Sequence, residues 1–376
     1  MGLNKNREKQ MKIGIITHYD VHNHGAVLQM YALVRVLNSL GNEAKGLTFS
    51  KNYDFLEKHA ENKYNISLKS LPYYIGYLLE KGIKKTYFNY KKKQILDNFK
   101  LINKMLEEKN SKSKNLDAVF IGSDEVFSIE TGLTPEFWGN NVKCKNIFSY
   151  AGCFGPTTLE FIKEKNAEEF IKKGINNLKE ISVRDENSKE IIETLSDKKA
   201  TLVCDPVILY GYIEEKENFR KKFNEKYVLV YSYDNNMNKD NEIINIKKFA
   251  KKNNYKIYSV GFYHKWCDKN INCNPIELLE YISNAEIILT DTFHGTVISL
   301  IMNKEFVTKV HINSNKLGFL LREYECIERI TKDFSDISEI TIRKIDYKKV
   351  NKIINKKREL SMNYIKSCLE KVENEK

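Results

Sequence analysis

The sequence predicts an α/β protein of two Rossmann-like domains, each built on a parallel sheet. Short apolar runs alternate with helical patterns along most of the chain, which is typical of parallel sheets with helical connections. This alternation pauses near residues 206–225 and then restarts. At 376 residues, the chain is also longer than one hydrophobic core usually supports. We therefore expect two domains with a boundary near residues 206–225.

Residues 11–205 are assigned to the N-terminal domain. An apolar run at 12–17 predicts the first strand, and a helix follows at 25–40 with Gly41 as its stop signal. Residues 52–110 are rich in Lys, Tyr, Leu and Asn and are expected to form a mostly helical insertion. Further strands are expected at 44–49, 116–121, 146–151, 180–183 and 201–204, and helices at 159–177 and from 186.

Residues 226–345 are assigned to the C-terminal domain, where the same pattern recurs. Strands are expected at 227–231, 256–260, 286–290 and 305–310, and helices at 241–252, 277–283, 294–302 and 316–322. A long charged helix is expected within residues 346–376. The order of these elements alone does not separate one two-domain α/β fold from another.

The charge pattern argues against a nucleic-acid partner. The formal net charge is +12, but the basic residues lie in short runs within helical stretches, such as residues 91–93, and no nucleic-acid motif accompanies them. We interpret them as solvated surface; an anionic substrate or peripheral contact with an anionic membrane is the other interpretation.

The cysteine pattern favours a reducing compartment. The seven cysteines are an odd number without repeated short spacing, and the first ten residues are polar. No apolar run reaches the roughly 18–20 residues of a membrane span. We expect a cytoplasmic protein, with the inner face of the membrane as a further location.

Ligands of open α/β sheets bind beyond the carboxyl ends of the strands. After the first strand, Asn23 or His24 can cap the next helix, and Gly25 allows close approach to the backbone of an anion-binding helix start. The three histidines of this loop suggest a metal, but no cysteine or carboxylate set completes one, so no metal is expected. A capped loop without a ligand is the alternative.

Two further strand ends carry polar side chains. Ser123 and Asp124 follow a buried run, where a carboxylate can bind sugar hydroxyls or act as a general base. A plain capping pair is the alternative. Arg184 follows another strand and offers a rigid fork for a carboxylate or phosphate, although Asp185 could instead neutralise it.

A fourth strand end lies in the C-terminal half. His294 and Gly295 begin a helix after a buried strand, a position suited to a phosphate group. A capping or core histidine is the alternative. A serine hydrolase is not indicated, because the chain has no Gly-x-Ser-x-Gly elbow.

Taken in order, these segments resemble the polysaccharide pyruvyl transferase family, and their order and spacing make the match specific. The matching stretches are Ile13-Gly14-Ile15-Ile16-Thr17, Asn23-His24-Gly25-Ala26, Gly122-Ser123-Asp124, Ser149-Tyr150-Ala151-Gly152 with Phe154-Gly155, Ser182-Val183-Arg184-Asp185, Asp205-Pro206, and Thr290-Asp291 with Phe293-His294-Gly295.

The resemblance implies a GT-B-like fold and an enzyme that moves pyruvate from phosphoenolpyruvate onto a sugar as a ketal. It implies no cofactor, and a glycan or lipid-linked sugar as the acceptor. By this resemblance, Arg184 and His294 would hold the carboxylate and phosphate of the donor, with Lys316 as a third candidate. His294 could also be the acid that protonates the donor.

One departure from the family pattern concerns the donor. Some members have Arg-Leu-His where this chain has Thr292-Phe293-His294, so a fixed positive charge is missing. Either Lys316 or another basic residue compensates, or the donor differs. Two alternatives therefore stay open: a GT-B glycosyltransferase that uses a nucleotide sugar, and a glycan-binding protein without catalysis. The sequence gives no prediction of oligomeric state.

Overall fold

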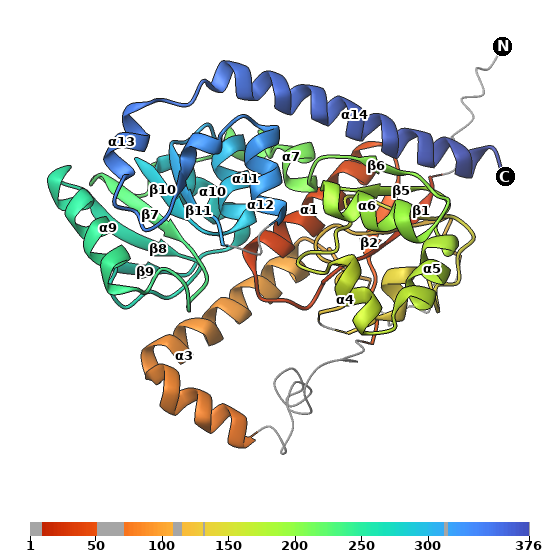
Figure 1. Ribbon diagram of the computed structural model, residues 1–376, viewed down its shortest axis with the longest axis horizontal. Coiled ribbons are helices and arrows are strands. Elements are labelled where there is room, and N and C mark those ends of the chain that lie inside the picture. The colour runs from red at the N-terminus through yellow and green to blue at the C-terminus, as the bar shows by residue number, and fades with distance from the viewer. Residues whose placement is uncertain (1–9, 51–70, 108–114, 131, 312–314, 376) are drawn as a thin grey trace, which may run out of the picture.

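The computed structural model describes residues 10–50, 71–107, 115–130, 132–311 and 315–375. The described strands form three parallel sheets, which build two halves that lie side by side and are covered by helices (Figure 1). Every strand pair in these residues is parallel. The predicted α/β class with parallel sheets is therefore confirmed.

The N-terminal sheet has the order β2-β1-β3-β4, and β5 and β6 form a second, smaller sheet. Isolated bridges from Phe148 to Glu180 and from Gly152 to Val183 connect the two. The strands are β1 (Lys12–Ile16), β2 (Glu43–Gly46), β3 (Ala118–Ile121), β4 (Ile147–Ser149), β5 (Ile181–Val183) and β6 (Ala200–Leu202). Both faces of β3 and β4 are buried, which explains why they appear in the sequence as continuous apolar runs.

The C-terminal sheet has the order β12-β11-β10-β7-β8-β9. Its strands are β7 (Tyr227–Tyr231), β8 (Lys256–Val260), β9 (Lys269–Ile271), β10 (Ile287–Thr290), β11 (Phe306–Lys309) and β12 (Ile330–Thr331). Its helices are α9 (Asp240–Lys252), α10 (Pro275–Asn284), α11 (Phe293–Ile301), α12 (Asn315–Glu323) and α13 (Ile337–Ile342).

Helix α1 (His24–Ser39) lies at the junction of the two halves. It packs against α7 (Pro206–Tyr210) on one side and against α10 of the C-terminal half on another. Most of its residues are buried, which explains why the sequence of this helix is apolar on nearly all faces. Its N-terminus points toward the region between the sheets.

The C-terminal helix α14 (Tyr347–Glu373) returns across the junction to the N-terminal half (Figure 1). The Tyr364 hydroxyl donates to the Ser149 carbonyl at 2.9 Å, and the Ser361 hydroxyl accepts from the Cys204 amide at 2.9 Å. Its long apolar face therefore closes the core of the N-terminal half. Among the described helices, none combines the length and apolar character that crossing a membrane requires.

The structure differs from the sequence prediction in several elements. The single helix expected at 159–177 is two helices, α4 (Leu159–Glu164) and α5 (Glu168–Asn177), because Asn166 adopts a left-handed conformation with φ of 53°. The expected boundary at 206–225 contains α7 and α8 (Ile213–Lys216). The elements β9, β12 and α13 were not predicted.

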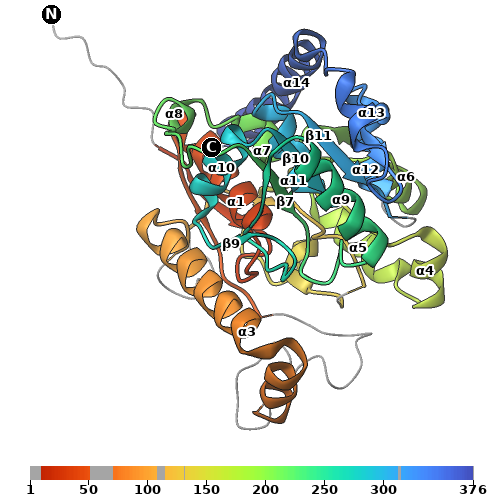
Figure 2. The same cartoon turned by 90° about the vertical axis from the view of Figure 1, so that its left-hand side faces the viewer.

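The insertion expected at 52–110 is described only in part. Helix α3 (Leu71–Ile102) fills most of the described portion, while residues 52–70 and 108–110 lie outside the described residues. Figure 2 shows α3 standing out from the two sheet layers. The remaining elements of the N-terminal half are η2 (Pro135–Trp138) and α6 (Glu186–Leu195).

His24, the first residue of α1, joins the two halves. Its Nε2 atom lies 2.9 Å from the Cys273 carbonyl, and a side chain at Gly261 would place its Cβ 2.9 Å from the imidazole ring. The side chain is fully buried, and this burial lowers the pKa of His24 from 6.5 to about 4. The His24 imidazole is therefore neutral in the folded protein at pH values where it binds a proton in the unfolded chain.

This histidine should make stability depend on pH. Between pH 6.5 and 4 the unfolded chain binds a proton at His24 and the folded chain does not, so stability falls as the pH drops through this window. The loss from this residue approaches about 3 kcal/mol, at 1.36 kcal/mol per pKa unit. Urea unfolding at several pH values should show a shallower decline for His24→Gln, whose amide can still donate to Cys273. Identical declines in both proteins would contradict this assignment.

Candidate functional site

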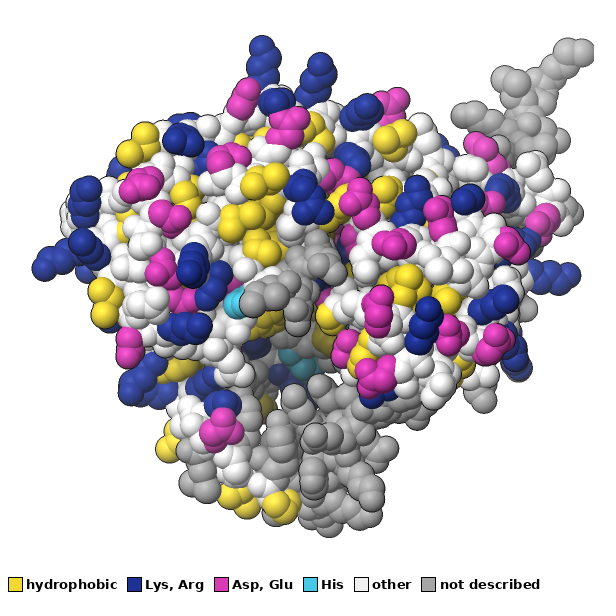
Figure 3. Space-filling model, in the orientation of Figure 1, with side chains coloured by type: hydrophobic (Ala, Val, Ile, Leu, Met, Phe, Trp, Pro, Cys, Tyr) yellow, Lys and Arg dark blue, Asp and Glu magenta, His cyan; other side chains and the backbone are white. Residues whose placement is uncertain are grey.

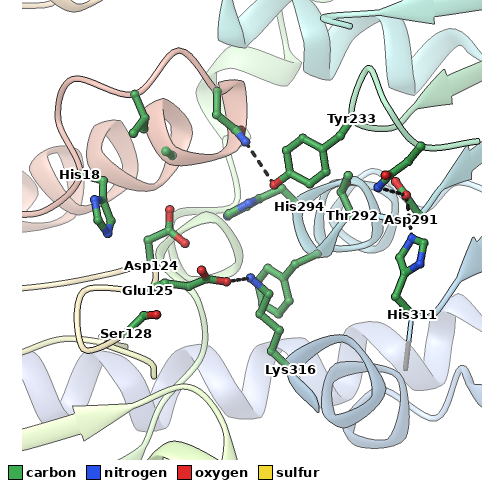
Figure 4. Close-up of a pocket in the computed structure, with 15 residues that line it drawn as sticks. His18, Asp124, Glu125, Ser128, Tyr233, Asp291, Thr292, His294, His311 and Lys316 are labelled. Carbon is green, nitrogen blue, oxygen red and sulfur yellow. Dashed lines mark hydrogen bonds and ion pairs between the residues drawn. The ribbon is translucent and has the colours of Figure 1, made fainter. Parts of the chain in front are cut away.

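A cavity of about 370 Å³ opens where the carboxyl ends of strands from both sheets meet (Figure 4). Residues of the segments that follow β1, β3, β7, β10 and β11 line it. The lining residues are His18, Val21, Asn23, Ala26, Asp124, Glu125, Ser128, Tyr233, Asn236, Asp291, Thr292, Phe293, His294, His311 and Lys316. The position is the one expected for ligands of parallel α/β sheets.

The start of α1 forms one wall of the cavity and is held by Asn23. The Asn23 Oδ1 atom accepts from the Gly25 amide at 2.8 Å, and its Nδ2 atom donates to the Tyr233 hydroxyl at 3.4 Å. A Cβ atom at Gly25 would lie 2.3 Å from Nδ1 of His294. Glycine is therefore required here because the helix approaches His294 from the other half of the protein.

Arg184 lies behind the cavity in a buried charge network. It donates from one terminal nitrogen to Asp205 Oδ2 at 2.8 Å and from the other to Asp124 Oδ1 at 3.3 Å. The Gln29 amide donates to the same Asp205 oxygen at 2.6 Å. The side chains of Arg184 and Asp205 are each only 1% exposed. This arginine therefore balances two carboxylates within the protein.

The positive charge of Arg184 lowers the pKa of Asp124. Burial favours the neutral carboxyl, but Arg184, aided by His18 and Lys316, outweighs it and holds the pKa of Asp124 below its usual value. Asp124 is therefore ionised at neutral pH. Such a carboxylate is a good hydrogen-bond acceptor but a weak general base, because the most effective bases have a pKa near the working pH.

His294 occupies the centre of the cavity, where the two halves meet (Figure 4). Burial lowers its pKa below the usual 6.5, although nearby Asp205 and Asp124 act in the opposite direction. Its Nε2 atom lies 3.8 Å from Asp205 Oδ2 and has no hydrogen-bond partner among the described residues. The hydrogen-bonding capacity of this buried ring nitrogen is therefore unused among the described residues, which is uncommon for a buried polar atom.

Lys316 reaches the cavity from α12 and pairs with Glu125 of the other half. Burial acts to lower the pKa of Lys316, but the Glu125 carboxylate outweighs it and raises this pKa. The ammonium also lies 5.9 Å from the centre of the Phe293 ring. Lys316 is thus a charged group at neutral pH, and its partner is a single carboxylate at the cavity wall.

Thr292 and Phe293 lie at the start of α11, next to His294. The Thr292 hydroxyl caps α11 by accepting from the Gly295 amide at 2.9 Å. The Phe293 ring covers the Arg184 guanidinium, whose central carbon lies 4.5 Å from the ring centre. Two cations therefore lie near Phe293, Arg184 beneath its ring and Lys316 in the cavity, and whether they replace the charge that the family pattern would supply stays a prediction.

The opposite side of the cavity holds an acidic group with a free oxygen. Asp291 Oδ2 accepts from the Asn236 amide at 2.6 Å and lies 3.0 Å from Nε2 of His311. Its Oδ1 atom is buried and has no partner among the described residues, and its side chain is 0% exposed. A buried carboxylate oxygen without a donor calls for a hydrogen-bonding ligand or a water molecule.

The structure brings together half of the predicted site residues. His294, Asp124, Lys316 and Asn23 line the cavity. The other four support its walls, and their direct contact with a ligand stays a prediction. They are Arg184, Gly25, Gly295 and Ser123, whose hydroxyl donates to the Ala151 carbonyl at 3.1 Å.

The sequence interpretation missed several lining residues of the C-terminal half. Tyr233 follows β7 and His311 follows β11, so the strand-end rule would have found both. Asn236 gives no local signal. Within the described parts of the chain, no group of three or more His, Cys, Asp or Glu side chains could hold a metal ion. The absence of a metal nevertheless stays an expectation.

Comparison with solved structures identifies the fold. The UDP-N-acetylglucosamine 2-epimerase from Rickettsia bellii matches with a TM-score of 0.53 and 12% identity, over 97% of this chain and 98% of that one. The UDP-GlcNAc 2-epimerase from Neisseria meningitidis matches with a TM-score of 0.50 and 11% identity, over 96% and 100%. At such identities the likeness shows a GT-B-like fold alone, as predicted.

Sequence comparison identifies the family. No curated protein matches the chain. A family model described as polysaccharide pyruvyl transferase matches residues 23–311, which is more than half of the chain and spans the segments that line the cavity from Asn23 to His311. The chain therefore belongs to the polysaccharide pyruvyl transferase family and is a transferase.

Proposed function

We propose that the protein transfers pyruvate from phosphoenolpyruvate to a sugar of a surface polysaccharide or its precursor, forming a ketal. Family membership supports the reaction class. The observation that carries the proposal is that His294, whose Nε2 atom has no hydrogen-bond partner among the described residues, lines a cavity that Lys316 also lines. A neutral histidine beside a cation suits an anionic donor.

The donor carries a carboxylate and a phosphate, so its binding needs positive charge. Among the described residues that line the cavity, Lys316 is the lysine, and it pairs with Glu125. Donor oxygens would replace the Glu125 carboxylate on Lys316, while the imidazole of His294 would donate a hydrogen bond to the phosphate. Arg184 contributes its charge from behind Phe293.

The proposed reaction proceeds through a cationic carbon. An acid protonates the methylene carbon of phosphoenolpyruvate, and one acceptor hydroxyl attacks the adjacent carbon and loses its proton. Phosphate then leaves with the electrons of its C–O bond, and the second hydroxyl attacks the same, now cationic carbon and loses its proton to the departed phosphate, which closes the ketal. Lys316 would stabilise the departing phosphate. The proposed reaction uses no further cofactor, and a cytoplasmic location is part of the proposal.

Asp291 is suited to the acceptor sugar. A carboxylate oxygen repels an anionic donor but accepts hydrogen bonds from hydroxyl groups. Asp291 lines the cavity and its Oδ1 atom has no partner among the described residues, so this side of the cavity suits sugar hydroxyls better than an anionic donor. The Tyr233 side chain, whose residue is 47% exposed, offers an aromatic face at the same cavity. We therefore assign the Asp291 side of the cavity to the acceptor.

The proposal predicts phosphate release that depends on both substrates. The purified protein should release inorganic phosphate from phosphoenolpyruvate in the presence of methyl galactoside, which offers a pair of hydroxyls for a ketal, and mass spectrometry should detect the pyruvylated sugar. The Asp291→Asn variant should raise KM for methyl galactoside by about tenfold, since one hydrogen bond to a charged group is lost. Its KM for phosphoenolpyruvate should change little.

Ligand-induced thermal shifts distinguish the proposal from its alternatives. Phosphoenolpyruvate should raise the melting temperature, because a ligand that binds only the folded state stabilises it. A rise with UDP-GlcNAc and none with phosphoenolpyruvate would favour a glycosyltransferase. Stabilisation by glycosides alone, without phosphate release from any acceptor tested, would favour a glycan-binding protein.

A further inference from the structure

Helix α3 carries an unusual concentration of exposed apolar side chains. Gly82 breaks it with φ of 77° and ψ of 159°, so residues 83–102 form a separate straight segment. On this segment Ile83 is 77% exposed, Tyr87 61%, Tyr90 56% and Leu101 75%. Exposed apolar groups that gather on one element generally mark an interaction site.

These four side chains form one stripe along the helix. At about 100° per residue, Ile83, Tyr87, Tyr90 and Leu101 fall within roughly 60° of one another, and the stripe is about 27 Å long. The Gln94 amide, which lies on the same face, donates to the Tyr90 hydroxyl at 2.8 Å. We name these four residues the α3 stripe. Ile102, which is 69% exposed, extends its apolar surface at the helix end.

The opposite face of the same segment fixes the helix to the protein. Phe88, Lys92, Leu96 and Phe99 are buried. The Phe88 ring packs 5.7 Å from Tyr263 of the C-terminal half, and the other three residues extend this buried face along the helix. Because packing holds the inner face, the exposure of the stripe is a property of the folded protein.

Positive charge flanks the α3 stripe. Lys84 and Lys91 lie on one side of it and Lys93 on the other, by their positions on the helix. The Lys91 ammonium lies 5.8 Å from the centre of the Tyr87 ring. Asp97 lies on the same face between Tyr90 and Leu101, where Lys100 at 2.8 Å and His22 at 3.4 Å pair with it. An apolar stripe between lysines is typical of helices that lie in the interface of an anionic membrane.

We infer that the α3 stripe docks the protein on an anionic lipid bilayer. A second copy of the chain fits this surface less well, because a symmetric dimer would place the flanking lysines of both copies against each other. The stripe is also far smaller than the roughly 20–30 residues that each partner contributes to a standard protein interface. A bilayer accepts a narrow apolar stripe, and its anionic headgroups complement the lysines.

Docking through α3 would also orient the cavity. Figure 3 shows a hollow between the two halves, on the face where α3 lies below them, whereas α14 lies along the opposite edge (Figure 1). In a protein bound through α3, the hollow would lie between the membrane contact and α14. The link to a lipid-borne acceptor rests on the proposed function, whereas the docking itself does not.

The test is flotation with lipid vesicles in the absence of substrates. The full-length protein should float with vesicles of phosphatidylcholine and phosphatidylglycerol in equal parts, and binding should weaken in high salt. It should not float with vesicles of phosphatidylcholine alone. The triple variant Ile83→Ser, Tyr87→Ser and Leu101→Ser should reduce the partition coefficient by about tenfold or more. Its melting temperature should stay unchanged, because the three side chains are exposed.

A matched variant controls for the loss of apolar surface. Ile213, Ile244 and Ile342 are 62%, 62% and 77% exposed on other elements, and their replacement by serine should leave flotation unchanged. An equal loss in this control, equal binding to neutral vesicles, or no binding by the unaltered protein would overturn the inference. A dimer of the unaltered protein that the stripe variant converts to a monomer would do the same.

Discussion

Replacement of His294 by glutamine is expected to lower kcat for pyruvyl transfer by about two to four orders of magnitude, the range typical of a lost general acid or base. The imidazole lies at the centre of the cavity, and its Nε2 atom has no partner among the described residues. Steady-state phosphate release provides the measurement. His22→Gln is the control, because His22 pairs with Asp97 outside the cavity. A His294→Gln rate within about tenfold of the unaltered enzyme would exclude the acid role.

The pH dependence of the same enzyme tests how His294 acts. Because burial lowers the pKa of His294 below 6.5, the acid form is present in the free enzyme only at lower pH. The value of kcat/KM for phosphoenolpyruvate should therefore decline as the pH rises through this lowered pKa. The phosphate of the bound donor raises the pKa of His294, so kcat should decline at a higher pH. Both declines should disappear in His294→Gln; their persistence would assign them to another group.

Replacement of Arg184 by methionine is expected to reduce the free energy of unfolding by about 3–5 kcal/mol, the cost typical of a buried ion pair that loses one partner. Methionine fills much of the space beneath Phe293 but removes the positive charge that balances Asp205, whose carboxylate keeps hydrogen bonds from the Gln29 side chain and the Val207 amide. The pKa of Asp124 should rise, because Arg184 is the main charge that lowers it. Urea unfolding at neutral pH measures the change in stability.

The double variant Arg184→Met and Asp205→Asn separates a charge effect from a packing effect. Asparagine removes the buried negative charge. Its oxygen can still accept from the Val207 amide, and its NH2 group can donate to Oε1 of a flipped Gln29 side chain, an atom that has no partner among the described residues. We therefore expect the double variant to recover most of the lost stability. Failure to recover would show that the arginine contributes through packing against Phe293. The affinity of both variants for phosphoenolpyruvate then reports how far a charge behind the cavity wall supports donor binding.

Local sequence patterns determined the strands and the polar residues that follow them. The runs before Asp124, Arg184 and His294 are apolar because both faces of their strands are buried in the structure. Parallel strands bring their carboxyl ends to one edge, so the ordered strand-end motifs also indicated the fold and the family. The same rule would have identified His311 and Tyr233.

Tertiary structure alone decided which of these side chains reach the cavity. Arg184 and His294 both follow buried strands, yet the first is enclosed by Asp205 and Phe293 and the second lines the cavity. The pairing of Lys316 with Glu125 joins residues 191 positions apart, and it exists because α1 and α14 hold the two halves together. A strand-end motif fixes the position of a residue at the edge of a sheet. The burial and the charge partners of that residue's side chain depend on contacts between distant segments.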